Sequence, residues 1–238
     1  MDSLDAYGRP ERAEAYHRRG GFDPPRKRAM LDAALDLLVD LAPGGGDVLE
    51  LGAGTGAFTR MLLSAGHFGR VAATDGAAAM LDVARRELGD GDGRLSLRAL
   101  DFTHPGWADE VGPAAFAAVA STLAIHHAPD KAGVFAEARR CLCPGGVLVV
   151  ADHLSGATDW TGAAIGRFRG RIRLGARARP EEIADFLRSD AAKQAQEGNR
   201  CESLAAYLGH LGSAGLRDAD CLWRDRWLAV FVARNPGT

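Results

Sequence analysis

A glycine-rich turn carries the residues best placed to bind a ligand. A short apolar strand, Val48–Leu51, runs into this turn, and a helix should follow it. Because Gly52, Gly54 and Gly56 lack a Cβ atom, the turn can be tight and a ligand can approach its backbone closely. The helix directs free N–H groups and a partial positive charge at the turn, which favours a phosphate or carboxylate. Glu50 adds a carboxylate at the end of the strand.

These glycines alone leave the identity of the ligand open. Gly52 and Gly54, together with Ala57, also satisfy the looser pattern of dinucleotide-binding turns. A nicotinamide or flavin cofactor and another adenosyl ligand are therefore both compatible with the turn. The choice between them depends on residues further along the chain.

Length, charge and composition limit the classes of protein to consider. The 238 residues suffice for one large domain, and the formal net charge of -2 gives no global attraction to nucleic acid or an anionic membrane. No apolar run approaches the roughly 20 residues of a membrane helix, and the first residues show no secretory signal. The four cysteines form no zinc pattern. We therefore expect a cytoplasmic protein with reduced thiols, no metal site and no membrane partner.

Helices and strands alternate along the chain. The pattern predicts helices near residues 10–17, from 24 onward, and over 56–64, 77–88, 131–142 and 202–211. It predicts strands at Val48–Leu51, 71–74, 95–100, 116–121, 147–152, 218–223 and 227–233. This alternation predicts an α/β fold with a doubly wound, mainly parallel sheet. The last two strands must pair antiparallel because their connection is short.

Five motifs lie at corresponding places around these strands. They are ELGAGTG (50–56), ATD (73–75), LDF (100–102), LAIHH (123–127) and LCPGG (142–146). With them the chain resembles the class I S-adenosylmethionine-dependent methyltransferases over about residues 26–154 and 202–234. The resemblance implies a seven-stranded sheet with an antiparallel last strand, which the terminal hairpin matches. One departure is Ala117, where many relatives carry an acid.

The resemblance implies a set of residues for S-adenosylmethionine. Asp75 would accept hydrogen bonds from the ribose hydroxyls, Asp101 would accept from the adenine amino group, and Glu50 would lie near the ammonium. A nicotinamide enzyme needs one acid after its second strand and no equivalent of the other two, so the linked acids favour the methyl donor. The implied cofactor-binding residues are Glu50, Gly52, Ala53, Gly54, Gly56, Asp75, Gly76, Met80, Asp101, Phe102 and Ser121.

These residues also have structural interpretations. Asp75 and Asp101 could cap helices, because aspartate is favoured at helix N-termini. Glu50 could face a helix dipole. Met80 and Phe102 could be ordinary core residues.

Three histidines are candidates for a general base, which the reaction needs only if the acceptor must lose a proton. His126 and His127 follow the fourth strand at the edge expected to face the cofactor, and His153 follows the fifth. An unperturbed histidine titrates at about 6.5, which suits a base near neutral pH. One of the first two could instead pack against or cap the next helix.

Two segments are expected to contact the substrate. N-terminal helices often close over the site in this family, which makes Tyr7, Tyr16 and His17 candidates. The second segment is an arginine-rich insertion, residues 155–200, between strand five and the last helix. It could bind a carboxylate or phosphate, with Arg167 and Arg171 as the candidates. The same arginines could contact RNA backbone, or form a solvated surface or a subunit contact.

These expectations divide the chain into three parts. Residues 1–44 are N-terminal helices that act as a lid, residues 45–154 and 201–238 form the methyltransferase core, and residues 155–200 form a helical cap between strand five and the last helix. The predicted activity is methyl transfer from S-adenosylmethionine to an O, N, S or C atom of a small molecule, an acidic one included, with S-adenosylhomocysteine as product. An RNA-modifying methyltransferase and a non-catalytic adenosyl-ligand-binding protein are the alternatives. A monomer or a homodimer is expected.

Overall fold

A seven-stranded sheet forms the centre of the molecule in the computed structural model, which describes residues 8–19 and 24–237. The strand order is β3-β2-β1-β4-β5-β7-β6. Neighbouring strands from β3 to β5 pair in parallel, and β7 is antiparallel to both β5 and β6. The strands are β1 (Val48–Leu51), β2 (Val71–Asp75), β3 (Leu95–Ala99), β4 (Phe116–Thr122), β5 (Leu142–His153), β6 (Arg217–Asp225) and β7 (Leu228–Arg234). The predicted doubly wound sheet with one reversed strand is confirmed.

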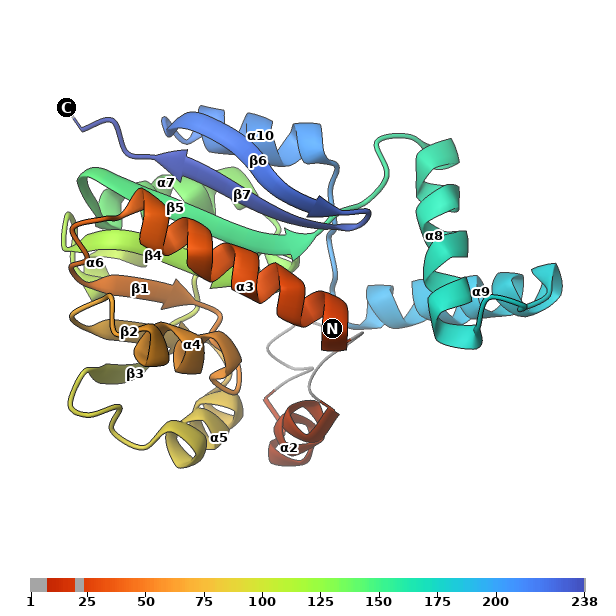
Figure 1. Ribbon diagram of the computed structural model, residues 1–238, viewed down its shortest axis with the longest axis horizontal. Helices are drawn as coiled ribbons and strands as arrows, with labels where there is room; N and C mark the ends of the chain where they lie inside the picture. Colours follow the sequence, from red (N-terminus) through yellow and green to blue (C-terminus); the bar gives the residue numbers. More distant parts are fainter. Residues whose placement is uncertain (1–7, 20–23, 238) are drawn as a thin grey trace.

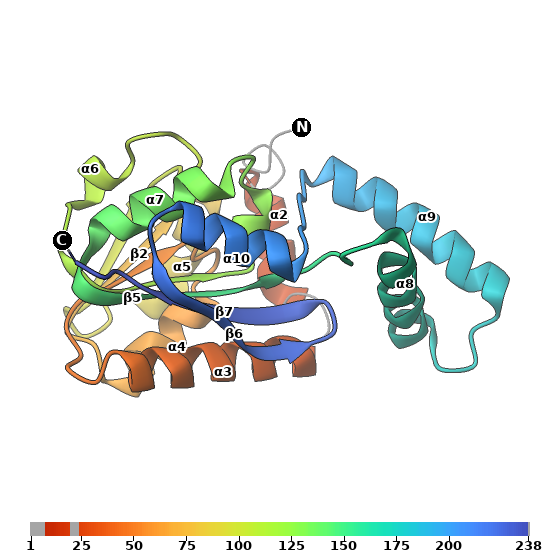
Figure 2. The same ribbon diagram turned by 90° about the horizontal axis from the view of Figure 1, so that it is seen from above.

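Helices cover both faces of this sheet (Figures 1 and 2). Helices α3 and α4 lie on one face, α7 and α10 lie on the other, and α2 packs against α5. The helical elements are α2 (Pro10–Arg19), α3 (Pro24–Leu41), α4 (Ala57–Ala65), α5 (Ala78–Leu88), α6 (Ala108–Val111), η1 (Ile125–His127), α7 (Lys131–Cys141), α8 (Asp159–Leu174), α9 (Pro180–Gln196) and α10 (Leu204–Ser213). The short elements α6 and η1 were not predicted, because one or two helical turns carry no periodic apolar pattern.

The sheet separates two apolar layers because successive side chains of a strand point to opposite faces. Val119 and Leu148, which are register partners in β4 and β5, pack with α7 and α10. The preceding pair, Ala118 and Val147, packs with α3 and α4. All four residues of β1 are buried, as expected for a central parallel strand covered on both faces. This packing fixes β1, and with it the glycine-rich turn, at the middle of the sheet.

Strand β5 is longer than the sequence predicts. It begins at Leu142, whereas the sequence predicts a strand that starts at Val147. Leu142 pairs with Phe116 of β4, and an irregularity in the register separates this pair from the regular ladder. The antiparallel neighbour β7 ends at Arg234, opposite Val147. Cross-strand pairing therefore extends β5 through residues that would form a turn in isolation.

Helices α8 and α9 form a cap that projects from one side of the core (Figure 2). The arrows of β1 and β5 point toward this side, so the cap arises at the carboxyl edge of the sheet (Figure 1). Helix α8 is continuous despite its glycines. A Cβ atom on Gly166 would lie 2.8 Å from Leu187, and one on Gly170 would lie 3.1 Å from Ile183, both in α9. The glycines thus permit close packing of α8 against α9.

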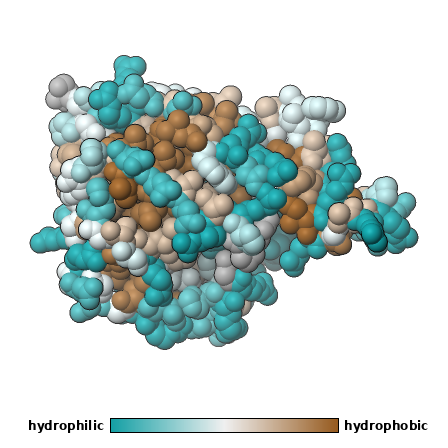
Figure 3. All heavy atoms as spheres, viewed as in Figure 1, coloured by the Kyte–Doolittle hydropathy of each residue, from teal (hydrophilic) through white to brown (hydrophobic). Residues whose placement is uncertain are grey.

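The surface is unevenly apolar. In the view of Figure 3, apolar atoms gather over the β6–β7 hairpin and the C-terminal part of α3, whereas the lower rim is hydrophilic. These elements carry Leu222, which is 50% exposed, and Leu41, which is 39% exposed. Within residues 8–19 and 24–237, no helix has the length and apolar character needed to cross a membrane.

Candidate active site

The glycine-rich turn connects β1 to α4 at the carboxyl edge. Its three glycines have φ values of 72° at Gly52, 58° at Gly54 and 84° at Gly56, a left-handed conformation that favours glycine. A Cβ atom on Gly52 would lie 2.2 Å from the Cβ of Ala124, so only glycine fits there. A Cβ atom on Gly54 would meet nothing within 4 Å. The turn is therefore packed at Gly52 and open at Gly54.

Glu50 presents a carboxylate that is not fully satisfied by the protein. Its side chain is fully buried, and Oε2 accepts a hydrogen bond of 2.6 Å from the hydroxyl of Thr59 in α4. Oε1 is also buried and accepts no hydrogen bond from any described residue. Burial raises the pKa of Glu50 to about 7. A buried acceptor without a donor is costly, so this oxygen fits a cationic ligand group such as an ammonium.

Asp75 fastens the turn to the end of β2. Its two oxygens accept hydrogen bonds of 2.8 Å from the backbone N–H groups of Gly54 and Ala77. Burial raises the pKa of Asp75, although these two bonds oppose the shift. The bond to Ala77 organises the start of α5, so the structural interpretation holds in part. It does not exclude ligand contact, because a carboxylate has further lone pairs. Gly76 lies between these groups, half-buried, in the bend after β2.

The remaining predicted cofactor residues border the same edge. Asp101 follows β3 and accepts hydrogen bonds from the backbone and hydroxyl of Thr103 through Oδ1. Phe102 is buried beside the turn, 3.4 Å from where a Cβ of Gly52 would lie, and Met80 is buried in the cluster between α2 and α5. Ser121 is buried near the end of β4, where its hydroxyl donates to the carbonyl of Leu51 at 2.8 Å.

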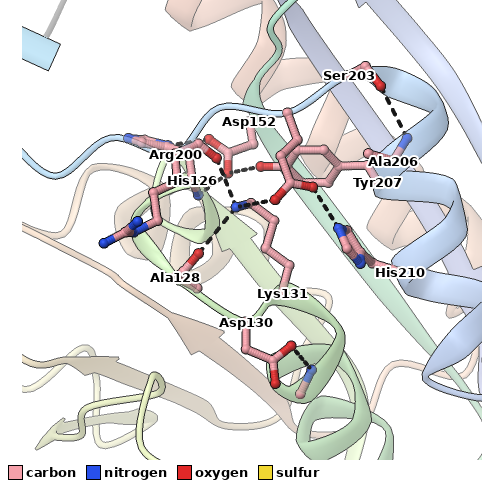
Figure 4. Close-up of polar contacts among 12 residues, drawn as sticks. His126, Ala128, Asp130, Lys131, Asp152, Arg200, Ser203, Ala206, Tyr207 and His210 are labelled. Atoms are coloured by element: carbon pink, nitrogen blue, oxygen red, sulfur yellow. Dashed lines mark hydrogen bonds and ion pairs between the residues drawn. The ribbon is translucent and has the colours of Figure 1, made fainter. Parts of the chain in front are cut away.

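The three predicted histidines meet around Asp152, the next-to-last residue of β5. Nδ1 of His126 lies 2.5 Å from Oδ1 of Asp152, and the backbone N–H of His126 donates to Oδ2 at 2.7 Å. The ring of His126 lies 4.1 Å from that of His127 and 5.0 Å from that of His153, centroid to centroid. Figure 4 shows Asp152 placed between His126 and Tyr207, whose hydroxyl donates to Oδ2 at 2.9 Å.

Burial and neighbouring charges determine whether Asp152 and His153 carry a proton. Burial opposes ionisation of Asp152, but His126, His153 and their hydrogen bonds outweigh it and lower its pKa to about 2. Asp152 is therefore ionised at neutral pH, and Nδ1 of His126 must donate to it. Burial is the main cause that lowers the pKa of His153 to about 3, with the neighbouring His126 as the next cause, so His153 is neutral. No described residue hydrogen-bonds to Nε2 of His126. With Nδ1 donating to Asp152, Nε2 is the His126 nitrogen that can accept a proton.

The side chains of His126, Asp152 and His153 lie close enough together to be considered as metal ligands. The Nδ1–Oδ1 separation of 2.5 Å, however, is that of a hydrogen bond. Two ligands of one ion, each about 2 Å from the metal, lie further apart than this. Asp152 also accepts from Tyr207 and from the backbone of His153. The geometry is therefore that of a hydrogen-bonded histidine–aspartate dyad.

A strained turn leads from β4 to His126. Leu123 follows the strand with a φ of 57°, a left-handed value that is uncommon outside glycine, and its N–H donates to Ala151 at 2.8 Å. Ala124, the next residue, contacts the glycine-rich turn at Gly52. The path of the chain thus places the dyad beside the predicted ligand site. Strain of this kind persists where the surrounding structure enforces it, often at functional sites.

The predicted substrate residues lie in different surroundings. Tyr16 packs against the apolar cluster that includes Met80, whereas Nε2 of His17 lies 3.6 Å from Glu87. Arg167 and Arg171 are exposed on α8. Tyr7 lies outside the described residues. Of the candidates that the structure describes, Tyr16 is the one that packs against a predicted cofactor residue, Met80.

Arg169 of the cap acts electrostatically on His153. It contributes to the low pKa of His153 and forms a 3.0 Å ion pair with Asp190. Its guanidinium also lies 6.0 Å from the ring centroid of Trp227.

Known proteins share this architecture. Residues 49–150 match the family model of the methyltransferase domain. The chain contains a methyltransferase domain. Phosphoethanolamine N-methyltransferase 2 from Haemonchus contortus, solved with phosphomonomethylethanolamine and S-adenosylhomocysteine, is similar with a TM-score of 0.67 and 16% identity, over 99% of this chain and 61% of that one. The CurJ carbon methyltransferase is similar with a TM-score of 0.68 and 14% identity, over 100% of this chain and 62% of that one.

Curated sequences similar to this methyltransferase domain are segments of much larger proteins. The polyketide synthase ThaQ from Burkholderia thailandensis is 28% identical over 152 residues, which are 60% of this chain and 7% of the synthase. The polyketide synthase component of lovastatin nonaketide synthase from Aspergillus terreus is 29% identical over 108 residues, which are 44% of this chain and 4% of the synthase. The match over residues 49–150 agrees with the family predicted from the five motifs, and this chain spans only a small part of these relatives.

Three residues of the candidate site were not predicted from the sequence. A signal for Asp152 was present, because it is an acid at the end of a strand adjacent to the one that leads to His126. Thr59 and Tyr207 carried no such signal. Their partners, Glu50 and Asp152, lie 9 and 55 residues away and are met only in the folded chain.

Proposed function

We propose that this chain transfers a methyl group from S-adenosylmethionine to a small molecule whose reacting atom must first lose a proton. The His126–Asp152 dyad carries this proposal. A methyltransferase acting on a nucleophile that is already unprotonated has no need of a base. Here a histidine oriented by a buried carboxylate lies at the carboxyl edge beside the glycine-rich turn.

The residues of the turn fit the methyl donor. The unsatisfied Oε1 of Glu50 would receive its ammonium, Asp75 its ribose hydroxyls, and Asp101 with Phe102 its adenine. The open space above Gly54 leaves room for the ligand against the backbone. When bound, S-adenosylmethionine supplies a methyl group that is already activated as part of a sulfonium. The protein therefore has to hold the acceptor in line and remove its proton.

His126 performs the proton removal in this account. The proton passes from the acceptor atom to Nε2, while the Nδ1–H bond to Asp152 is retained. The resulting imidazolium is stabilised by the carboxylate, which remains ionised because its pKa is about 2. Asp152 acts through His126 and is a positioning residue. Tyr207 and the backbone of His153 hold Asp152 in turn.

The acceptor proposed here is a carbon acid. Two of the similar structures are carbon methyltransferases, DszA and CurJ, and the curated relatives are polyketide synthases. An imidazole base works best on a proton of comparable acidity. Carbon between two carbonyl groups carries such a proton, whereas carbon in a simple alkyl chain does not. We therefore assign a 1,3-dicarbonyl compound, free or as a thioester, as the substrate class.

A panel of acceptors tests this assignment. The purified chain is incubated with S-adenosylmethionine and either the acetoacetyl thioester of N-acetylcysteamine, a phenol or a primary amine, and S-adenosylhomocysteine is measured by mass spectrometry. Turnover with the dicarbonyl compound, and a product methylated on carbon, is expected. Turnover with the amine or the phenol alone would contradict the assignment of a carbon acid as the acceptor. Tight binding of S-adenosylhomocysteine with no turnover on any acceptor would favour a non-catalytic binding protein.

A further inference from the structure

Lys131, the first residue of α7, places a buried ammonium next to the dyad. Its side chain is fully buried, which is rare for lysine. Nζ donates to the carbonyl of Ala128 at 3.2 Å, to the carbonyl of Arg200 at 2.8 Å and to Oε1 of Glu202 at 3.2 Å. An ammonium has three N–H donors, so each finds an acceptor. Figure 4 shows this nitrogen between Ala128, Arg200 and the dyad.

These acceptors belong to two segments that are remote in the sequence. Ala128 follows the short helix η1, which carries His126. Arg200 and Glu202 lie on the return limb, residues 199–203, which leads from the cap back to α10. The backbone N–H of Arg200 also donates to the carbonyl of His126 at 2.7 Å. Lys131 therefore closes a second connection between the return limb and the segment that holds the base.

The outgoing limb of the cap, residues 154–158, leads from β5 to α8. It meets the return limb at Glu202. Leu154 comes directly after Asp152 and His153 and forms an isolated parallel bridge with Glu202. The N–H of Ser155 donates to the carbonyl of Glu202 at 2.8 Å. The side chain of Glu202 also bonds to His210 of α10 at 2.6 Å. Glu202, which accepts a hydrogen bond from Lys131, thus links both limbs of the cap two residues beyond Asp152.

We propose that Lys131 is a positioning residue that fixes the return limb of the cap to His126 and thereby sets the substrate side of the site. An apolar side chain of similar length would fill the same space without the cost of burying a charge. The ammonium does what an apolar group cannot, because it makes three directional bonds to two segments. The effect expected on turnover rests on the proposed function, whereas the effect on the limb does not.

Hydrogen exchange and steady-state kinetics test this role together. Lys131→Met keeps the length of the side chain and removes the charge, and Lys193→Met, at an exposed lysine of α9, is the matched control. Amides of residues 199–203 should exchange at least about tenfold faster in Lys131→Met, because loss of hydrogen bonds to a charged group favours opening by that factor or more. The kcat for methyl transfer should fall at least about tenfold, with the Kd of S-adenosylhomocysteine little changed. Lys193→Met should match the wild type in all three.

Glu202→Ala keeps the test decisive if Lys131→Met does not fold. It removes one of the three acceptors and leaves both carbonyls in place, so exchange over residues 199–203 should rise by a smaller factor. Wild-type exchange over this limb in a folded Lys131→Met or Glu202→Ala protein would overturn the proposal. So would faster exchange with an unchanged kcat, because the limb would then move without affecting the base. If the wild type transfers no methyl group, the proposed function fails, and the exchange result still decides whether Lys131 holds the limb.

Discussion

Among single residues, Glu50 and Asp152 show how burial gives two carboxylates opposite properties. Both are fully buried. Asp152 is surrounded by donors and is ionised, whereas Glu50 has one hydroxyl partner and a pKa of about 7. The first can stabilise a positive charge that forms on His126. The second has an oxygen, Oε1, that can accept a hydrogen bond from a cationic ligand. The different roles follow from the number of donors around each group.

The raised pKa of Glu50 predicts how stability depends on pH. Its pKa is about 7 in the folded chain, against an ordinary value of 4.5, so the folded state holds the proton more tightly. Stability should therefore fall as pH rises from 4.5 to 7, and then level off. For a fully buried group, this shift corresponds to about 3 kcal/mol at most. Urea unfolding at pH 5 and pH 8 should show that the free energy of unfolding falls less between these two pH values in Glu50→Gln than in the wild type.

The control for this effect is Glu181→Gln, which changes an exposed carboxylate of α9. It should follow the wild type at both pH values. If the free energies of unfolding of Glu50→Gln and the wild type fell equally, the raised pKa of Glu50 would be wrong.

At the scale of elements, the turn between β1 and α4 contains two glycines that are expected to be required for different reasons. Gly52 is required for packing and Gly54 for ligand binding. Gly52 faces Ala124, where no side chain fits, and Gly54 faces open space. Both have left-handed φ values, so substitution strains the backbone at either position. Only Gly54 should be needed chiefly for the ligand.

Two alanine substitutions test this distinction. Gly52→Ala should destabilise the fold by about 2–4 kcal/mol, because strain and overpacking add. Gly54→Ala should cost about 1 kcal/mol, since its Cβ meets no protein atom. It should nevertheless weaken S-adenosylhomocysteine binding at least about tenfold, because the Cβ enters the space of the ligand. Denaturant unfolding and calorimetric titration measure the two effects.

Gly66 provides the matched control. It lies at the other end of α4 with a φ of 63° and also has open space around its Cβ position. Gly66→Ala should carry the same backbone strain and bind S-adenosylhomocysteine as the wild type does. Equal affinities in Gly54→Ala and Gly66→Ala would mean that the ligand does not lie over Gly54.

At the scale of the whole molecule, sequence reasoning succeeded where structure is local. The strand β1 and the start of α3 were predicted to the residue, because apolar runs and a proline mark them directly. The continuation of β5 to Leu142 could not be predicted, since β4 supplies the pairing that extends it. The three histidines were identified as candidate bases from their positions after strands. Asp152 as their organiser, and Lys131 as the link to the cap, depend on contacts between segments that only the fold brings together.

The most direct test of the central claim is the kcat of His126→Asn for methyl transfer to the acetoacetyl thioester of N-acetylcysteamine. The asparagine amide can still donate to Asp152 but cannot accept the proton of the acceptor. His104→Ala, at an exposed histidine, is the control. We predict that kcat falls by about 10²–10⁴ in His126→Asn and not in the control, with the affinity for S-adenosylhomocysteine retained in both. A kcat within about threefold of the wild type would contradict the account, because a removed general base costs more than that.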